Sequence, residues 1–460
     1  MCTAARSALS QGDPERALTL LEQACGIELS QANQPLEGLK KAAQALPDQH
    51  WIAELEAELL LQTTLQGEQL AHGLGPRGYG LWLDHCEPHL PPPVLRLRQR
   101  WWLDSVPPGV CDGWLVLVAE DVRLRPGALQ VLEAALYSWS GELPDLLYAD
   151  EDWIDASGGR HTPWFKPGWV PESFWSTPWL ESFSAWRLSW LLHSGLAPPP
   201  PAGTARFAWL LAALERAPRI GHVPQVLVHR FGPSDAANPT RAALLGDHLQ
   251  RLGEGNVQVR ARQDPYGSYS LVWPLPPGIT CRVVIPTRNR ADLLEACLRS
   301  LEATVQGLAF EVMVVDNGST EPNLADLLER WSQRMGPRFL SLRQEEAFNW
   351  SQLSNRGAEG ATTTLLLFLN NDVEADRPGW CEAMASQALR PAVGCVGANL
   401  RYPDGTLQHG GVVVGMHGGA DHAYRGLRPS HGVHRGRSRC LSGWGAVTGA
   451  CLMVRRELFE

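Results

Sequence analysis

Three short polar clusters in the C-terminal half of the chain carry residue types that can bind a ligand. They are PTRN at Pro286–Asn289, DNGS at Asp316–Ser319 and NND at Asn370–Asp372. Each cluster comes at the end of an apolar run of the kind that forms a buried strand. Because ligands bind at the carboxyl ends of the strands in open α/β sheets, we expect the three clusters to be neighbours at one sheet edge.

The residue types predict the chemistry of this edge. Asp316, followed by Asn317 and Gly318 in a tight turn, can accept hydrogen bonds from a ribose or a base. Asp372 is a hard oxygen ligand suited to Mg²⁺ or Mn²⁺, and magnesium-like ions take one or two protein carboxylates and complete their shell with water and phosphates. Taken singly, the Asp316 segment equally suits a simple β-turn, and Asp372 equally suits a helix N-cap.

The elements around these clusters alternate between strand and helix. Strands are predicted at 281–289, 311–319, 339–342 and 365–369, with helices at 292–303, 324–331 and 351–361 between them. This alternation predicts βαβ units and a mainly parallel sheet. A dinucleotide site is disfavoured because no GxGxxG follows the first strand, and GxxxxGK[ST] is absent too.

The length and composition of the chain limit its class. At 460 residues it exceeds one ordinary core, so we expect three parts, 1–75, 76–270 and 271–460. The formal net charge of −9 argues against a nucleic-acid partner, which would require a cationic surface. The N-terminus lacks the apolar region of a secretion signal and no stretch reaches 18 apolar residues, so we expect a cytoplasmic protein without a membrane span.

The first 270 residues contain two segments that differ in composition and sequence pattern. Residues 1–75 show helical spacing and predict a helical cap or docking segment, whereas 76–270 are rich in Trp and Pro, with short strands such as the apolar run at 114–119. At 94–102, Leu alternates with Arg beside two Trp. An exposed strand is the favoured interpretation, and peripheral contact with the inner face of a membrane is the alternative.

Six motifs follow one another within residues 281–460: VVIPTRNR, VVDNGSTE, FNWSQLSNRG, LFLNNDVE, GANLRYPDGTLQHGGVV and AVTGACLMVRRELF. In this order they resemble a family 2 glycosyltransferase with a GT-A fold. The resemblance implies an α/β, Rossmann-like and mainly parallel sheet flanked by helices. It also implies a truncated C-terminus for this module, with the general base beyond Glu460.

The resemblance assigns roles to individual residues. The nucleotide-sugar pocket would be lined by Pro286, Thr287, Asn289, Asp316, Asn349, Asn355 and Asn371. Asp372 would be the chief metal ligand, together with Asn370, which stands where the family's first Asp is expected. The acceptor side would include His409, Trp444, Thr448 and Gly449, and Phe348 and Leu353 would pack a helix against the sheet.

The middle of the chain resembles a degenerate copy of the same fold. Ala119-Glu120-Asp121-Val122 parallels Asn370-Asn371-Asp372-Val373, and Ala119 replaces the first metal carboxylate. No strand end of the PxYN type and no turn of the DDxS type precede Trp114. We therefore predict that this degenerate module, 76–270, binds no donor and acts as a scaffold or acceptor platform.

The resemblance implies a metal-dependent, inverting glycosyltransferase that uses Mg²⁺ or Mn²⁺. It would move a sugar from a UDP- or dTDP-sugar to a glycan or lipid-linked glycan in the synthesis of cell-surface polysaccharide. Two alternatives stay open. One is a non-catalytic scaffold that binds a nucleotide sugar or glycan. The other is a nucleotidyltransferase, which would normally show a Gly-rich loop containing Lys or Arg after the first strand.

Overall fold

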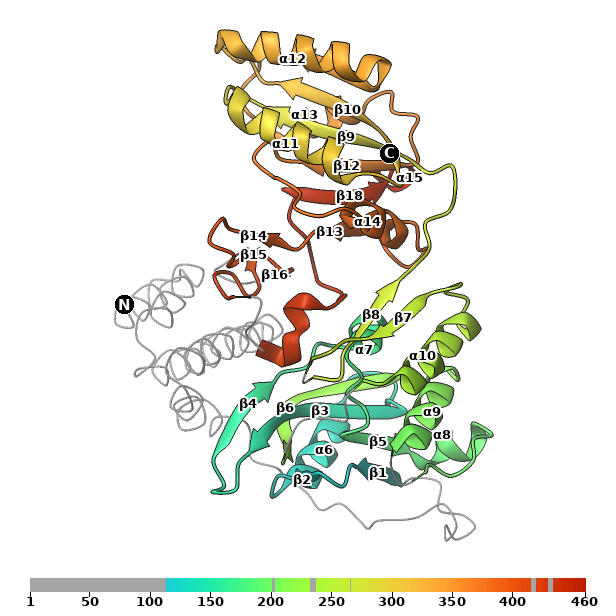
Figure 1. Cartoon of the computed structure of the whole chain (residues 1–460). Helices are drawn as coiled ribbons and strands as arrows, with labels where there is room; N and C mark the ends of the chain where they lie inside the picture. Colours follow the sequence, from blue (N-terminus) through green and yellow to red (C-terminus); the bar gives the residue numbers. More distant parts are fainter. Residues whose placement is uncertain (1–112, 201–202, 232–236, 265, 415–418, 429–432) are drawn as a thin grey trace, which may run out of the picture. The chain divides into compact units, whose positions relative to one another are not determined.

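The computed structural model describes residues 113–200, 203–231, 237–264, 266–414, 419–428 and 433–460 (Figure 1). These residues form two compact units. The first unit contains the described residues up to Gly253, together with Val259–Leu271 and Arg401–Gly443. The second unit contains Glu254–Gln258, Val272–Leu400 and Trp444–Glu460.

The two units bear on the expected domain boundaries. The helical segment expected at 1–75 and the strand expected at 94–102 lie outside the described residues. The division at 270/271 stays a prediction, although the longest segment of the second unit begins close to it, at Val272. The segment Arg401–Gly443, which we expected in the last domain, groups with the first unit.

The second unit is built on a mainly parallel sheet. Its strand order is β11-β10-β9-β12-β18-β13. The four strands β9 (Thr280–Thr287), β10 (Ala309–Asp316), β11 (Phe339–Arg343) and β12 (Leu365–Leu369) run parallel, and β18 (Cys451–Arg455) and β13 (Cys395–Gly397) continue the sheet antiparallel. The predicted α/β class with alternating strands and helices is therefore confirmed for this unit.

The burial of β12 on both faces explains why its sequence is entirely apolar. Leu365, Leu367 and Leu369 pack in the core under α11 (Ala291–Thr304), α12 (Pro322–Met335) and α14 (Trp380–Ala388). Leu366 and Phe368 belong to a second core, with residues of α13 (Trp350–Ala358). Because successive side chains of a strand point to opposite faces, a strand covered on both faces needs a continuous apolar run. Full burial of each leucine contributes roughly 1.5–3 kcal/mol.

The start of α13 corrects one expectation. Leu353 is buried against the sheet, as expected. The packing role expected for Phe348 is wrong, because its side chain is 65% exposed. The helix begins only at Trp350, with Asn349 as its N-cap, so Phe348 lies in the preceding loop rather than on the buried helix face. Two short elements complete this unit, η4 (Gly336–Arg338) and α15 (Arg456–Phe459).

The first unit has a mixed sheet. Its strand order is β1-β5-β3-β6-β2, with β4 paired to β3. The neighbours β3 and β6 run parallel, and the other described pairs run antiparallel. The strands are β1 (Trp114–Val118), β2 (Val122–Leu124), β3 (Leu146–Ile154), β4 (Arg160–Trp164), β5 (Phe183–Arg187) and β6 (Ile220–Arg230).

Helices lie beside this sheet (Figure 1), and three two-stranded ladders are separate from it. The helices are α6 (Ala128–Tyr137), α7 (Pro171–Ser176), α8 (Leu188–His193), α9 (Gly203–Leu214), α10 (Pro239–Arg251) and the 3₁₀ segment η6 (Val433–Arg439). The ladders pair β7 (Gln258–Ala261) with β8 (Tyr269–Val272), β14 (Leu400–Arg401) with β15 (Leu407–His409), and β16 (Val412–Val414) with β17 (Ala420–His422). Across the described ranges, no helix combines the length and apolar character that a membrane span requires.

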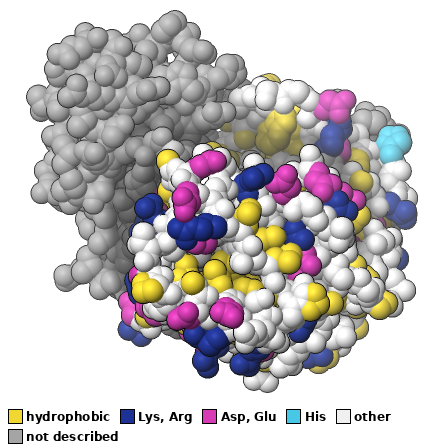
Figure 2. Space-filling view, turned by 90° about the horizontal axis from the view of Figure 1, so that it is seen from above, with side chains coloured by type: hydrophobic (Ala, Val, Ile, Leu, Met, Phe, Trp, Pro, Cys, Tyr) yellow, Lys and Arg dark blue, Asp and Glu magenta, His cyan; other side chains and the backbone are white. Residues whose placement is uncertain are grey.

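The surface carries charges of both signs. On the face shown in Figure 2, Lys and Arg side chains are interspersed with Asp and Glu side chains, and hydrophobic side chains lie between them. This face therefore offers no continuous basic area of the kind that binds a phosphate backbone.

Candidate functional site

The second unit brings the three polar clusters together at the carboxyl ends of its strands. In the register of β9 and β10, Thr287 stands opposite Asp316, and β12 flanks β9 on its other side. The backbone N–H of Asn317 donates to the carbonyl of Thr287 at 2.8 Å. The side-chain amide of Asn371 donates to the hydroxyl of Thr287, also at 2.8 Å. The three clusters are neighbours, as the strand pattern predicts.

The loop after β9 has an uncommon backbone. Asn289 and Arg290 both adopt the left-handed region, with φ of 56° and 53°. Such residues persist where surrounding contacts hold them. The N–H of Asn289 donates to Ser319 Oγ at 2.7 Å, and its Oδ1 accepts from the N–H of Thr320 at 2.8 Å. Asn289 thus joins two loops of the site, and its side-chain oxygen is engaged in that contact.

Asp316 is held in place from two directions. Its carboxylate is buried, and Oδ1 accepts from the N–H of Ser319 at 2.9 Å, which closes the turn. Gly318 lies in that turn with φ of 68°. Oδ2 accepts from Nη1 of Arg343 at 2.9 Å. The turn interpretation is therefore correct, and it coexists with a carboxylate at the strand edge.

Sequence reasoning missed Arg343. It ends β11, and the register of β10 and β11 places it opposite Asp316. No motif marks it, and the only available signal was a basic residue at the end of the next predicted strand. Its guanidinium also donates to the carbonyl of Ser319 at 3.1 Å. Arg343 therefore fixes both the carboxylate and the turn.

Asp372 differs from Asp316 in being exposed and unengaged. Within the part of the chain that the structure describes, its carboxylate has no hydrogen bond and no ion pair. The N-cap interpretation is wrong, because α14 begins at Trp380 with Gly379 as its N-cap. The N–H of Asn370 donates to the carbonyl of Ala450 at 2.9 Å, which anchors this segment, while its side-chain amide has no described partner. Asp372 and Asn370 thus offer free oxygens at the end of β12.

The donor set fits a hard divalent ion. Among the described residues, no group of three or more His, Cys, Asp or Glu side chains is arranged to hold a metal. Mg²⁺ nevertheless takes only one or two protein carboxylates and fills its shell with water and substrate phosphates. One free carboxylate beside a free amide oxygen matches that pattern, and nothing in it suits a thiolate-bound or histidine-bound metal.

The structure also places the three other residues that we expected to line the nucleotide pocket. Asn349 is the N-cap of α13, and its Oδ1 accepts from the N–H of Gln352 at 3.1 Å. Asn355 lies exposed on the surface of α13. Pro286 is half-buried in β9 opposite Val315. The described contacts include no hydrogen bond from the side chain of Asn349 or Asn355 to the strand-end residues.

The acceptor-side candidates fall in both units. Trp444, Thr448 and Gly449 belong to the second unit and precede β18. Trp444 is half-buried, and Thr448 Oγ1 accepts from the N–H of Ala450 at 3.3 Å. A Cβ at Gly449 would stand 2.8 Å from Cζ2 of Trp350, so α13 packs where only glycine fits. Packing against Trp350 is therefore sufficient to explain why residue 449 is a glycine.

His409 belongs to the first unit. Its side chain is 2% exposed, and its Nδ1 lies 2.8 Å from Nδ1 of His422. Burial, with a smaller contribution from His422, lowers the pKa of His409 to about 4. His409 is thus a buried neutral imidazole in a different unit from the other three acceptor-side candidates.

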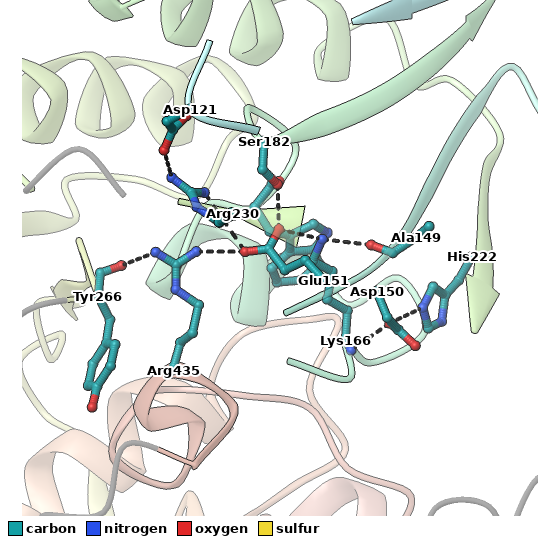
Figure 3. A network of polar contacts seen from close by, with 11 residues as sticks. Asp121, Ala149, Asp150, Glu151, Lys166, Ser182, His222, Arg230, Tyr266 and Arg435 are labelled. Carbon is teal, nitrogen blue, oxygen red and sulfur yellow. Dashed lines mark hydrogen bonds and ion pairs between the residues drawn. The ribbon is translucent and has the colours of Figure 1, made fainter. Parts of the chain in front are cut away.

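The first unit contains a buried ionic network centred on Glu151 (Figure 3). This fully buried carboxylate accepts hydrogen bonds from Lys166 Nζ at 3.0 Å, Ser182 Oγ at 2.5 Å and Arg435 Nη1 at 3.1 Å. Burial alone would raise the pKa of Glu151, but Lys166, Arg230 and Arg435 outweigh it and lower the pKa to about 2. The network keeps Glu151 ionised inside the unit.

Arg230 links this network to Asp121, whose segment parallels Asn370–Asp372 in the sequence. Figure 3 shows its guanidinium between Glu151 and Asp121. Nη2 donates to Asp121 Oδ2 at 2.7 Å, and Nη1 lies 3.8 Å from Glu151 Oε1. Asp121 therefore has a fixed cationic partner, whereas Asp372, its counterpart in the sequence parallel, has none in the described structure.

The second unit is thus an open α/β unit with an oxygen-rich candidate site where its parallel strands end. Residues 282–460 match the family described as glycosyl transferase family 2, so this part of the chain is a domain of that family.

Curated relatives extend the similarity beyond that domain. The chain is 36% identical over 371 residues to the O-antigen biosynthesis protein RfbC of Myxococcus xanthus, which covers 76% of this chain and 28% of that protein. It is 32% identical over 367 residues to the uncharacterized protein y4gI of Sinorhizobium fredii, covering 75% of this chain and 39% of that protein. The chain thus spans well under half the length of these relatives.

Shorter matches concern named glycosyltransferases. The validoxylamine A glucosyltransferase of Streptomyces hygroscopicus is 31% identical over 128 residues, covering 26% of this chain and 30% of that enzyme. Among solved structures, the mannosyltransferase PcManGT from Pyrobaculum calidifontis, in complex with GDP-Man and Mn²⁺, is 23% identical with a TM-score of 0.25. That likeness covers 28% of this chain and 38% of the mannosyltransferase.

Proposed function

We propose that the second unit transfers a sugar from a nucleotide-sugar donor to a glycan acceptor during the synthesis of cell-surface polysaccharide. One observation carries this proposal: the free, exposed carboxylate of Asp372 follows the end of β12, within a family 2 domain. Its neighbour Asn371 bonds Thr287, which stands opposite Asp316. The relative named for O-antigen biosynthesis supports the class of product, and the similarity to a glucosyltransferase supports the class of reaction.

In this proposal, different strand-end residues contact or position different parts of the donor. The Asp316 carboxylate has four lone-pair sites, and its described hydrogen bonds to Ser319 and Arg343 use two of them. The remaining sites can accept from a ribose hydroxyl or a base N–H. Thr287 and Asn371, joined to each other, set the distance between this nucleotide side and the phosphate side of the pocket.

Asp372 and Asn370 would hold Mg²⁺ or Mn²⁺ against the diphosphate. A bound ion there neutralises the charge that develops on the leaving diphosphate. The exposure of Asp372 leaves room for substrate oxygens in the same coordination shell. UDP- and dTDP-sugars are the donors we propose, and a glycan or lipid-linked glycan is the acceptor.

Inverting transfer also requires a carboxylate that takes the proton from the acceptor hydroxyl. Glu457 is paired with Arg455 at 3.3 Å, and Glu460 is paired with Arg456 at 2.8 Å. These exposed carboxylates are held by their own neighbours at the last helix of the unit. We therefore assign the general base to neither of them.

Calorimetry tests the proposal. UDP and dTDP are titrated into the full chain with and without Mn²⁺, and Asp372→Ala is compared with Asp376→Ala, an exposed carboxylate four residues further on. We expect metal-dependent binding that disappears in Asp372→Ala and persists in Asp376→Ala. If neither nucleotide binds under any condition, the proposal is wrong. Binding that persists in Asp372→Ala would remove the metal role from this residue.

A further inference from the structure

The first unit contains a polar hollow that the proposed transfer does not use. Its volume is about 320 Å³, within the range of small-molecule sites. The lining comes from the segment after β1, the loop before β5, the first turns of α9 and α10, the end of β6 and the residues before β8. The charged and aromatic lining residues are Glu120, Asp121, Glu181, Arg206, Arg230, Arg241, Tyr266 and Tyr269.

In this hollow, the positive charge next to Asp121 comes from an arginine side chain of the protein. Ala119 offers no ligand, and the Asp121 carboxylate is occupied by Arg230 at 2.7 Å. Arg230 is held in turn by its approach to the fully buried Glu151 (Figure 3). A divalent ion would have to displace a guanidinium that the buried network keeps in position. The hollow is therefore a site that works without a metal.

Arg206 is the lining residue with donors left over. It is only 6% exposed, yet no carboxylate of the described residues lies within ion-pair distance of it. Nε donates to the carbonyl of Pro200 at 3.1 Å, and Nη1 donates to that of Val118 at 3.2 Å. Nη2 has no partner in the described structure. Nη2 is not among the fully buried atoms that lack a partner, so it is accessible from the hollow that Arg206 lines. A ligand hydroxyl there would replace water as its acceptor.

The balance of charges selects the kind of ligand. Three arginines and three carboxylates line the hollow, so their formal charges cancel. A phosphate offers only acceptors and would meet the carboxylates of Glu120, Asp121 and Glu181. A hydroxyl can accept from a guanidinium and donate to a carboxylate at the same time. The lining therefore matches a ring that carries several hydroxyls, and Tyr266 adds an aromatic surface beside it.

We propose that this hollow binds a neutral, hydroxyl-rich sugar unit of the acceptor glycan without a metal. Arg206 donates to a ring hydroxyl through Nη2, and the exposed Glu120 accepts from another. That the sugar belongs to the acceptor rests on the proposed function, whereas sugar binding in the hollow does not. The first unit would then hold a glycan while the second unit holds the donor.

Saturation-transfer NMR on the full chain tests this in EDTA, with rhamnose, mannose and N-acetylgalactosamine as probes. Wild type is compared with Glu120→Ala and Arg206→Gln in the hollow, with Asp372→Ala in the second unit, and with Arg216→Gln, an exposed arginine just beyond α9. We expect a signal for at least one sugar that falls at least threefold in both hollow variants. The signal should stay unchanged in Asp372→Ala and Arg216→Gln.

Several results would overturn the proposal. They are no signal from any of the three sugars, a signal that survives Glu120→Ala, or displacement of the sugar by inorganic pyrophosphate, which would make the hollow an anion site. If Arg206→Gln fails to fold, Glu120→Ala decides, because Glu120 is exposed and has no described partner. The proposed transfer is tested separately, since its readout is Mn²⁺-dependent nucleotide binding, which EDTA abolishes here.

Discussion

The side-chain amide of Asn371 donates a hydrogen bond of 2.8 Å to the hydroxyl of Thr287, a residue 84 positions earlier in the chain. This bond joins the segment after β12, which carries Asp372, to the end of β9. Both strands are buried on two faces, so the bond connects two rigid supports. The spacing between the proposed phosphate and nucleotide contacts is therefore fixed before any ligand arrives.

Thr287→Val and Asn371→Ala measure this connection. Each substitution should destabilise the end of β9 by about 1 kcal/mol, the usual net contribution of one hydrogen bond. The double variant should cost less than the sum, because both changes remove the same bond. Hydrogen exchange of β9 peptides across a urea series measures the free energies. Strict additivity would show that the two side chains act independently.

Arg343→Gln tests how Asp316 is held. The substitution leaves a carboxylate that is 5% exposed without its cationic partner, so we expect a loss of about 1–3 kcal/mol in the stability of the second unit. Arg330→Gln is the matched control, since Arg330 pairs with Glu295 at 3.2 Å on the surface, where such pairs contribute at most about 1 kcal/mol. Urea midpoints of the two variants are compared. Equal midpoints would mean that Arg343 is only a surface charge.

Gly449→Ala separates packing from substrate contact. The new Cβ would meet the rigid indole of Trp350 at 2.8–2.9 Å, and overpacking of this kind costs typically about 1–3 kcal/mol. Gly394→Ala is the control, because no atom lies within 4 Å of a Cβ at that position. Thermal unfolding should show a lower transition for Gly449→Ala only. A variant with full stability would return Gly449 to the acceptor-side hypothesis.

The sequence allowed the strand ends to be predicted for a physical reason. A run such as Leu365–Leu369 fits only a strand covered on both faces, and parallel strands bring their carboxyl ends to one edge. The meeting of Thr287, Asp316 and Asn371 follows from those two facts. Residue type also limited what Asp372 can bind, because exposed carboxylates prefer hard cations.

Other contacts could not be predicted from the sequence, because they depend on strand register and on long-range packing. Arg343 meets Asp316 only through the alignment of two neighbouring strands, and Arg435 meets Glu151 across 284 positions. Phe348 was wrongly expected to pack, because it lies in the loop before α13 and its side chain is exposed. Asn289 shows that one side chain can hold two loops together within a predicted pocket, which its residue type does not reveal.

His409 predicts a pH dependence for the first unit. Burial lowers its pKa to about 4, and in the unfolded chain it returns toward 6.5, so the unfolded state binds more protons between these values. Stability should therefore be complete above pH 6.5 and fall as the pH drops toward 4, by on the order of 2–3 kcal/mol from this residue. His409→Gln should flatten the slope of urea midpoint against pH. An unchanged slope would show that His409 does not titrate on unfolding.

The last prediction concerns Glu151. Its carboxylate is the common partner of Lys166 and Arg435 and the near neighbour of Arg230, all inside the first unit. Glu151→Gln keeps the shape but removes the charge that balances these cations, and breaking a buried ion pair from one side costs about 3–5 kcal/mol. We expect the first unit to unfold at a much lower urea concentration, as hydrogen exchange of β3 peptides would show.

Glu142→Gln provides the matched control, because Glu142 pairs with Arg219 while its own side chain is 81% exposed. That substitution should leave the urea midpoint nearly unchanged. If Glu151→Gln were equally mild, nearby carboxylates would have to balance the cations or water would have to solvate them, and the network would not fix Arg230. Asp121 would then lose its permanent partner, and the argument that the hollow of the first unit needs no metal would fail with it.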